Sequence, residues 1–236
     1  MLKTIMIDGE RVEYTLERKR VKNINLRIKP DGSIYVSAAR GVPMAAIERM
    51  MLENAPYVAA HRQKAAARME RLRDCADGRA VRLFGAVCPV EVRAGAKNAV
   101  EYSAGRVVIS LRDVQDDELR QKTLDKWLRA QCVAAVTACC ERVYPAFAAR
   151  GVKWPEIRFR RMTSRWGSCQ PTRGVLTFNT GLVHADAQCI EYVVAHEFCH
   201  FLHPDHSPAF HAELAALIPD WREREKRLND TPLPSL

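Results

Sequence analysis

The chain has 236 residues, of which 47% are hydrophobic and 28% are charged, values typical of a soluble globular protein. This composition excludes an intrinsically disordered chain, and no apolar run approaches the roughly 20 residues that a membrane-spanning helix needs. The 37 Lys and Arg residues exceed the 28 Asp and Glu residues, and the net charge of +9 favours anionic partners, although a solvated basic surface explains it equally well.

Two further features predict the compartment. Residues 1–11 contain charged side chains after the first few positions and lack the apolar core of a signal peptide. We therefore expect a cytoplasmic protein without a membrane partner. The eight cysteines include no C-x-x-C pair, and we expect reduced thiols, most of them buried as small hydrophobic side chains.

Turn signals divide the first 40 residues into predicted β-hairpins. Asp8-Gly9 and Pro30-Asp31-Gly32 favour tight turns. The second turn lies between the runs 24–28 and 34–36, in which apolar and polar residues alternate. Alternation with a period of two around such a turn predicts an antiparallel hairpin.

Helical patterns follow. Pro43 opens a stretch with apolar residues at helical spacing, residues 54–56 interrupt it, and the run 57–73, rich in Ala and Arg, predicts a solvent-facing helix. Gly78 then marks a break before four short β-type segments, 81–84, 87–92, 100–102 and 107–111. No internal repeat is evident in the sequence.

A long helix is predicted from about residue 116, because acidic residues suit its N-terminus and apolar residues recur at helical spacing up to Phe147. We place the likeliest domain boundary near Asp113. The chain is thus expected to be an α+β protein: residues 1–113 form a β-rich N-terminal region with a helical insertion, and residues 114–236 form a second, α+β domain.

The C-terminal part begins with two predicted strands, 157–160 and 175–179. A helix is expected from about residue 187 to residue 202, where Pro204 stops it, and another from about 208 to 218. The charged segment 222–226 and the residues 231–234 after it are expected to form a frayed tail.

The residues that carry chemistry are His196-Glu197-Phe198-Cys199-His200, an H-E-x-x-H motif on a predicted helix. Positions i and i+4 lie on one helix face, so the two imidazoles can bind one divalent ion, and Glu197 can reach a water molecule beside it as a general base. Five of the seven histidines fall between His196 and His211. The alternative reading is a pair of hydrogen-bonded core histidines.

A catalytic zinc site needs a third protein ligand. We favour His206, because the chain can turn at Pro204 and return an imidazole to the ion. Glu213 on the following helix is the alternative, and His203 and His211 are weaker candidates. Zn²⁺ is the expected cofactor from the ligand type, with other divalent metals possible.

Residues 165–169 form a second motif, Arg-Trp-Gly-Ser-Cys. We expect Arg165 to bind a substrate carboxylate or phosphate, or else to form a structural ion pair. Trp166 is expected to pack, Gly167 to permit a tight turn or a close backbone approach, and Ser168 to line a cleft. Strand 175–179, with Asn179 at its end, is expected to form the cleft edge, where an extended peptide can add as a further strand.

These two motifs, with residues 176–179, 192–200, 206–207 and Phe210, make the chain resemble the YgjP-like family of metal-dependent hydrolases, which is related to the SprT-like and WLM metallopeptidases. The resemblance implies a zincin-like catalytic domain with the HExxH helix packed on a small sheet. It also implies His196, His200 and His206 as ligands and Glu197 as the catalytic acid/base. The sequence departs from the family's usual pattern at Asp205, where Asn is frequent, and at His211, where Trp is usual.

Three functions remain open from the sequence. The first is a zinc-dependent metallopeptidase, which acts on a peptide. The second is a nucleoside triphosphate (UTP) pyrophosphatase, an activity also ascribed to the YgjP-like family and compatible with the basic charge. The third is a nucleic-acid-associated protease, by analogy with the SprT-like and WLM relatives. The oligomeric state stays open.

Overall fold

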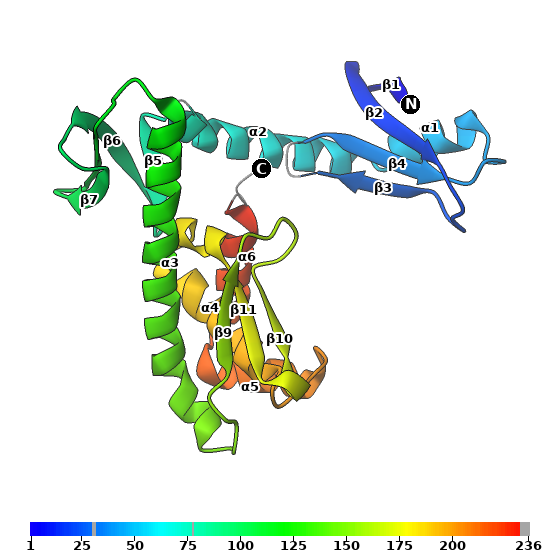
Figure 1. Cartoon of the computed structure of the whole chain (residues 1–236). Helices are drawn as coiled ribbons and strands as arrows, with labels where there is room; N and C mark the ends of the chain where they lie inside the picture. Colours follow the sequence, from blue (N-terminus) through cyan, green and yellow to red (C-terminus); the bar gives the residue numbers. More distant parts are fainter. Residues whose placement is uncertain (30–31, 77, 232–236) are drawn as a thin grey trace. The chain divides into compact units, whose positions relative to one another are not determined.

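The computed structural model describes residues 1–29, 32–76 and 78–231, and its chain divides into two compact units, residues 1–73 and 74–236 (Figure 1). Each unit contains its own cluster of buried apolar side chains. Both combine helices with sheets, which confirms the predicted α+β class.

The first unit is built on a four-stranded sheet. Its strands are β1 (Leu2–Ile7), β2 (Glu10–Arg18), β3 (Asn25–Ile28) and β4 (Ile34–Ala38), in the order β1-β2-β4-β3. The predicted antiparallel pairing of β3 with β4 is confirmed, although Pro30 and Asp31 of its turn lie outside the described residues. Strands β2 and β4 run parallel, so the β2–β3 loop must cross the end of β4.

One face of this sheet is buried. Strand β2 alternates buried and exposed residues, and its inward side chains Val12, Tyr14 and Leu16 share a core with Ile47 and Met51. The last two belong to α1 (Met44–Glu53), which follows Pro43 as predicted. Helix α2 (Ala55–Ala76) begins directly after Asn54 and runs across the division between the units.

The second unit opens with a sheet of the same strand order. Its strands are β5 (Ala80–Leu83), β6 (Ala86–Ala94), β7 (Ala99–Ser103) and β8 (Arg106–Leu111), arranged β5-β6-β8-β7. As in the first sheet, the two inner strands are parallel and each outer strand is antiparallel to its neighbour. The chain therefore contains a structural repeat, although no repeat is evident in its sequence.

The division between the units falls at residues 73 and 74 and does not coincide with the boundary that we expected near Asp113. The reason is burial. Ile109 and Leu111 of β8 are fully buried in one cluster with Leu128 and Cys132 of α3 (Asp117–Ala148). The second sheet thus shares its core with the C-terminal elements. Its β-type sequence had led us to assign it to the N-terminal region.

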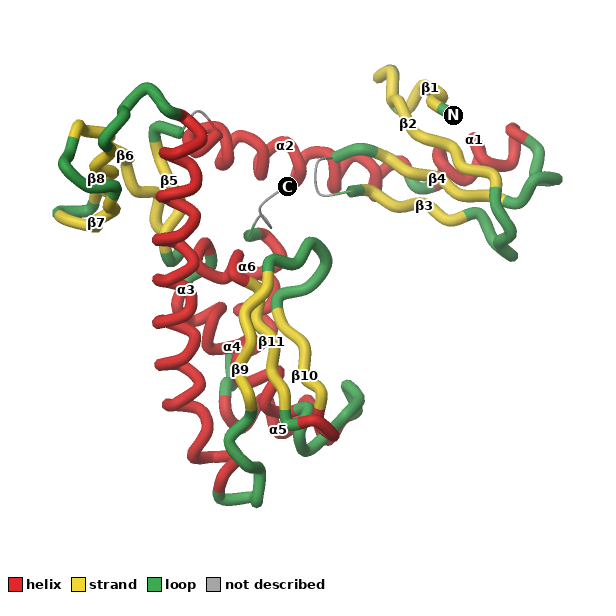
Figure 2. The backbone as a smooth tube through the Cα atoms, viewed as in Figure 1, coloured by secondary structure: helices red, strands yellow, loops and turns green. Residues whose placement is uncertain are grey.

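The remaining elements form a small sheet and three helices (Figure 2). The sheet contains β9 (Glu156–Arg160), β10 (Gly167–Gln170) and β11 (Val175–Asn179), in the order β10-β11-β9. Because β11 is the central strand and all its residues are buried, it offers no free edge. This corrects the expectation that strand 175–179 forms the cleft edge, since the edge strands are β10 and β9.

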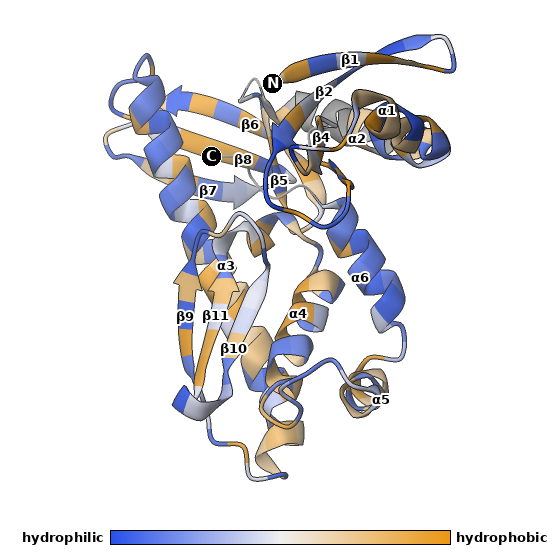
Figure 3. Ribbon diagram, turned by 90° about the vertical axis from the view of Figure 1, so that its right-hand side faces the viewer, coloured by the Kyte–Doolittle hydropathy of each residue, from blue (hydrophilic) through white to orange (hydrophobic). Residues whose placement is uncertain are grey.

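Helices α4 (Ala187–Cys199), α5 (Pro208–Leu217) and α6 (Trp221–Asp230) complete the second unit. Figure 3 shows α4 as mainly hydrophobic and α6 as mainly hydrophilic. The segment expected to be a frayed tail is the helix α6, because Trp221 and Leu228 are buried in the core and Arg224 forms ion pairs with Glu191 and Asp220. Residues 232–236, which include most of the rest of that tail, lie outside the described residues.

None of the eight cysteines forms a disulfide bond in the described parts of the chain, and six of them are buried, as expected. Burial raises the pKa of Cys132 and of Cys139 to about 11, which keeps both thiols protonated and unreactive at neutral pH. Among the described residues, no helix combines the length and apolar character required to cross a membrane.

Candidate metal centre and active site

Helix α4 places two imidazoles side by side. Asp186 caps its N-terminus by accepting a hydrogen bond from the backbone N–H of Cys189, and the helix ends at Cys199. His196 and His200 are separated by slightly more than one turn, with ring centroids 5.0 Å apart. His200 Nδ1 lies 3.1 Å from the carbonyl oxygen of His203, to which it donates, and this bond leaves Nε2 with its lone pair free.

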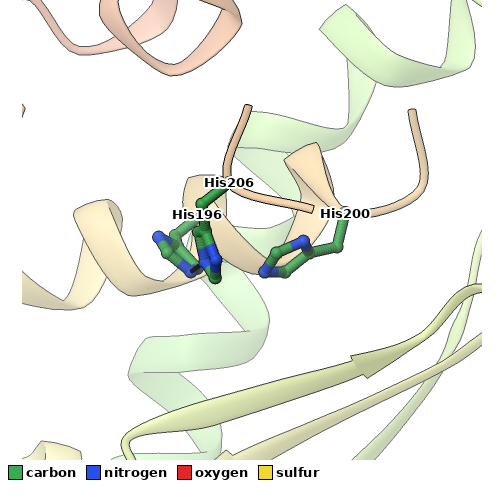
Figure 4. Close-up of side chains that lie close together, drawn as sticks. All are labelled: His196, His200 and His206. Carbon is green, nitrogen blue, oxygen red and sulfur yellow. Dashed lines mark hydrogen bonds between the residues drawn. The ribbon is translucent and has the colours of Figure 1, made fainter. Parts of the chain in front are cut away.

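The third imidazole comes from the loop between α4 and α5. Ser207 begins α5 by accepting a hydrogen bond from the backbone N–H of Phe210, and His206 is the residue before it. His206 Nε2 lies 3.1 Å from His196 Nε2 (Figure 4). Two nitrogen ligands of one tetrahedral zinc ion are about 3.3 Å apart, given Zn–N bonds of about 2.05 Å. The separation therefore matches two ligands of one ion.

The structure brings together His196, His200 and His206, whose candidate ligand atoms all lie within 4.8 Å of one another. Among the described residues, this is the one group of three or more such side chains close enough to hold an ion. Glu213, the alternative third ligand, is instead paired with Arg150. His203 contributes its carbonyl oxygen, and its ring is not in the group.

Phe210 supports the three imidazoles. Its ring is completely buried, and its centroid lies 4.9, 4.8 and 4.8 Å from those of His196, His200 and His206. In the sequence, Phe210 stands out only through the family resemblance, and this supporting role was not predicted. The available signal was its spacing, because a residue three positions after a helix cap points back toward that helix's own start.

Glu197 packs against the backbone of β10. A Cβ atom added to Gly167 would lie 2.5 Å from Glu197 Oε1, so the Glu197 side chain would have to shift. The prediction that Gly167 permits a close backbone approach is therefore confirmed, and the partner in that approach is the carboxylate of the HExxH motif. Glu197 is buried, and its Oε2 has no hydrogen-bond partner among the described residues.

The electrostatics of the cluster favour neutral imidazoles and a buried carboxyl group. Burial, followed by the neighbouring imidazoles, lowers the pKa of His196 to about 3. Burial raises the pKa of Glu197 to about 8, and the Arg165 guanidinium partly opposes that shift. A neutral imidazole is the form that binds a metal ion, so this environment keeps the histidines in their ligand state.

The three predicted substrate-binding residues, Arg165, Ser168 and Asn179, occupy different positions. Arg165 is exposed and acts electrostatically on Glu197. Ser168 follows Gly167 in β10, and because strand side chains alternate between faces, it points away from Glu197. Trp166 is partly buried against the core, as predicted.

Asn179 is fully buried, and its side chain is used by the backbone. Its Nδ2 donates to the carbonyl oxygens of Met162 and Arg165, at 2.7 and 2.8 Å, and its Oδ1 accepts from the N–H of Gly181 at 3.0 Å. As placed, it has no group left for substrate. We propose that Asn179 positions the segment carrying Arg165, in place of the substrate contact expected from the sequence.

Comparison with known proteins adds the family. The model of the YgjP-like metallopeptidase domain matches residues 22–231. The chain belongs to the YgjP-like family. It is thus a metal-dependent hydrolase of a metallopeptidase family, as the resemblance implied, and the matched range extends over parts of both units.

Two solved structures show partial similarity, and both are metallopeptidase zymogens. Abylysin of Pyrococcus abyssi is 20% identical, over 39% of this chain and 90% of that chain, with a TM-score of 0.36. Jannalysin of Methanocaldococcus jannaschii is 18% identical, over 40% of this chain and 93% of that chain, with a TM-score of 0.35. No match is found among curated proteins.

The residues present fit the divalent ion that a metallopeptidase family implies. Three imidazole nitrogens converge, and no carboxylate or thiolate joins them in the group. Glu197 Oε2 and His196 Nδ1 are buried without a hydrogen-bond partner among the described residues. Buried orphan polar atoms are costly, and a hydrated cation beside them relieves the cost at Glu197.

Proposed function

We propose that this protein is a zinc-dependent peptidase in which His196, His200 and His206 hold the ion and Glu197 is the general base. The observation that carries the proposal is the convergence of three imidazoles next to a buried carboxylate with one unpaired oxygen. Nitrogen ligands of this kind suit zinc. When bound, a zinc ion supplies Lewis acidity toward a carbonyl oxygen and makes water acidic at neutral pH.

Glu197 performs the proton transfers in the proposed reaction. Its carboxylate accepts a proton from the attacking water and delivers it to the nitrogen of the leaving amine, so the water oxygen bonds to the carbonyl carbon as the peptide C–N bond breaks. Gly167 leaves room for the Glu197 carboxyl group on the β10 side. Arg165, together with a cation held by the three imidazoles, would oppose the burial that raises the pKa of Glu197 and so favour its charged form. Burial excludes the bulk water that would otherwise compete for the proton.

Strand β10 is the proposed substrate edge. It pairs with β11 on one side, and it has no further neighbour in the sheet as described. Gly167 of this strand contacts Glu197. An extended peptide that forms backbone hydrogen bonds with the outer edge of β10 would therefore lie close to the Glu197 carboxylate. This assigns the edge role, expected for strand 175–179, to its neighbour in the sheet.

The test combines metal analysis with parallel activity assays. Wild type, Glu197→Gln and His206→Ala are incubated with a mixture of unstructured peptides and, separately, with UTP and other nucleoside triphosphates. We expect wild type to bind about one zinc per chain and to cleave peptides. Glu197→Gln retains zinc and loses activity by roughly 10²–10⁴-fold, the usual contribution of a general base, and His206→Ala loses both zinc and activity.

His203→Ala is the matched control, because it removes an imidazole from the same loop and leaves the carbonyl oxygen that fixes His200. It is expected to keep zinc and activity. Conversion of a nucleoside triphosphate to its monophosphate and pyrophosphate, lost in Glu197→Gln and without peptide cleavage, would replace the peptidase assignment by a pyrophosphatase. Normal zinc content in His206→Ala would refute the ligand set.

A further inference from the structure

The positive charge of the protein is concentrated in one unit. Residues 1–73 contain 15 Lys and Arg against 8 Asp and Glu, a net charge of +7, whereas residues 74–236 contain 22 against 20. The unit that holds the three histidines is thus nearly neutral, and almost all of the excess lies outside it. A charge of this size on a small unit attracts anions.

Within the first unit, the cations gather at one hollow. It has a volume of about 670 Å³, and its lining consists of the β2–β3 loop and the residues that follow β4. The topology explains this arrangement, because β3 is not the neighbour of β2 and the loop must cross the end of β4. The lining residues are Arg18, Lys19, Arg20, Val21, Lys22, Ala39 and Arg40.

Part of this lining is a rigid frame. Arg18 donates from Nη1 to the carbonyl oxygens of Ala39 and Val42, at 2.8 and 2.7 Å, which ties β2 to the segment after β4. The backbone N–H of Lys19 donates to the carbonyl oxygen of Ala38. The Lys19 side chain pairs with Glu17. These contacts use Arg18 and Lys19 internally and hold the loop in place.

The other three cations of the lining have no partner among the described residues. Arg20, Lys22 and Arg40 are exposed, and none forms an ion pair or side-chain hydrogen bond within the described parts of the chain. Like charges gathered without a counter-ion repel one another, so the arrangement costs free energy in the protein alone. An anionic ligand offsets that cost.

The cationic surface continues beyond the hollow along β3. Arg27 and Lys29 are exposed at alternate positions of that edge segment, and the positive charge of Arg27 acts on Lys19. This extent exceeds what one nucleotide needs and suits a strand with regularly spaced phosphates. No aromatic side chain for base stacking lines the hollow, and Tyr35, which Lys19 contacts, already donates to Glu17.

We propose that Arg20, Lys22 and Arg40 form a nucleic-acid site that contacts the phosphate backbone without reading the bases. The site is independent of the metal centre, and binding there needs neither zinc nor peptide cleavage. Backbone contacts of this kind hold a protein on nucleic acid whatever the sequence, and their affinity falls steeply with salt.

The test measures binding of the full-length protein to a fluorescent 20-base-pair DNA by anisotropy at several salt concentrations. The triple variant Arg20→Gln/Lys22→Gln/Arg40→Gln is expected to bind on the order of tenfold or more weakly and to lower the slope of log K against log salt by about 2–3, since each lost phosphate contact removes about 0.9. Single variants at these positions, with smaller risk to the fold, each lower the slope by about 0.9. Circular dichroism confirms folding.

The matched control is Lys97→Gln/Lys122→Gln/Lys153→Gln, which removes the same charge from exposed positions of the second unit. It is expected to bind DNA nearly as wild type does. The proposal is overturned if both triple variants lose the same affinity, or if neither changes. It is also overturned if UTP, or polyglutamate of equal charge, displaces the DNA at equal concentration, which would identify a nucleotide site or a general anion site.

Discussion

The two four-stranded sheets share their topology and differ in what they do. Each sheet consists of two antiparallel strand pairs, and the inner strands of the two pairs run parallel to each other. In each, the first residue after the second strand donates its backbone N–H to the last residue of the fourth strand, Lys19 to Ala38 and Gly95 to Leu111. The first turns also match, with positive φ at Asp8 and Gly9 and at Phe84 and Gly85.

What each sheet meets decides its role. The turn of the second sheet is bonded to the segment between β11 and α4, because the N–H of Phe84 donates to the carbonyl oxygen of Val183 and His184 Nδ1 donates to that of Arg82. Val183 and His184 belong to η2 (Thr180–His184), which follows β11 directly. In the second sheet, the loop between β6 and β7, residues 95–98, contains one cation. The first sheet has three unpaired cations in and beside the corresponding loop between β2 and β3.

The shared strand order does not by itself produce the basic hollow of the first sheet. On the second sheet, Arg93 pairs with Glu101 and Arg106 pairs with Glu91, so these two cations of its strands have acidic partners. Arg112, at the end of β8, donates to the carbonyl oxygen of Ala96 and closes the loop. The same framework can therefore be built without a cluster of unpaired cations beside its loop, and the unpaired cations of the first sheet need a reason other than the fold.

The largest expected effect is a loss of hydrolytic activity on substitution in the second unit. Gly167→Ala should reduce hydrolytic activity by about 10²–10⁴-fold, because its Cβ would lie 2.5 Å from Glu197 Oε1 and the general base would have to move. The measurement is kcat/KM on a cleaved peptide, with zinc content and thermal stability as checks that the fold persists.

Gly41→Ala is the control for that variant. Gly41 lies in the first unit, has nothing within 4 Å of an added Cβ and needs no positive φ, so activity should stay within about twofold of wild type. Equal loss in both variants would contradict a catalytic function confined to the second unit.

The cluster of three histidines could be predicted from the sequence because its signal is local. His196 and His200 are held by helix periodicity, and His206 follows a helix stop at Pro204, so distances of a few residues fixed the geometry. Arg165 and Gly167 were found as a motif, but their meeting with Glu197 depends on packing of a strand against a helix some 30 residues later. No local pattern reveals such a contact.

The structural repeat escaped for a different reason. The turn of the first sheet is Asp8-Gly9, a recognisable signal, whereas the second is Phe84-Gly85, and a bulky aromatic residue at positive φ is uncommon. The burial patterns of β2 and β6 also differ, because one packs on a helix of its own unit and the other on a larger core. Equivalent backbones therefore carry unrelated side-chain patterns.

A matched pair of core truncations should sharpen the contrast between the sheets. Ile34→Ala in β4 and Ile109→Ala in β8 each remove the same side chain from an inner strand, and each is expected to cost about 2–4 kcal/mol of unfolding free energy. All four tryptophans lie in residues 74–236, so their fluorescence reports on that unit. Ile109→Ala should lower the urea midpoint of the fluorescence transition.

Ile34 belongs to the separate buried cluster of the first unit. Ile34→Ala should therefore shift the circular dichroism transition and leave the fluorescence midpoint nearly unchanged. A fluorescence midpoint that falls equally in both variants would show that the two cores unfold as one, and the distinction drawn between the sheets would then be structural only.

The smallest expected effect tests whether the second sheet's turn is fastened to the metal-binding helix. Gly9 and Gly85 occupy equivalent turn positions with φ of +83° and +88°, so alanine costs about 1–2 kcal/mol of backbone strain at either. An added Cβ at Gly9 meets nothing within 4 Å, whereas at Gly85 it would lie 3.0 Å from Cβ of Asp186, the cap of α4. Gly85→Ala should therefore lose about 1 kcal/mol more than Gly9→Ala and weaken zinc retention under chelator challenge, because displacing Asp186 removes a helix cap. Equal losses in urea unfolding, with zinc release unchanged, would mean that the turn touches α4 without supporting it.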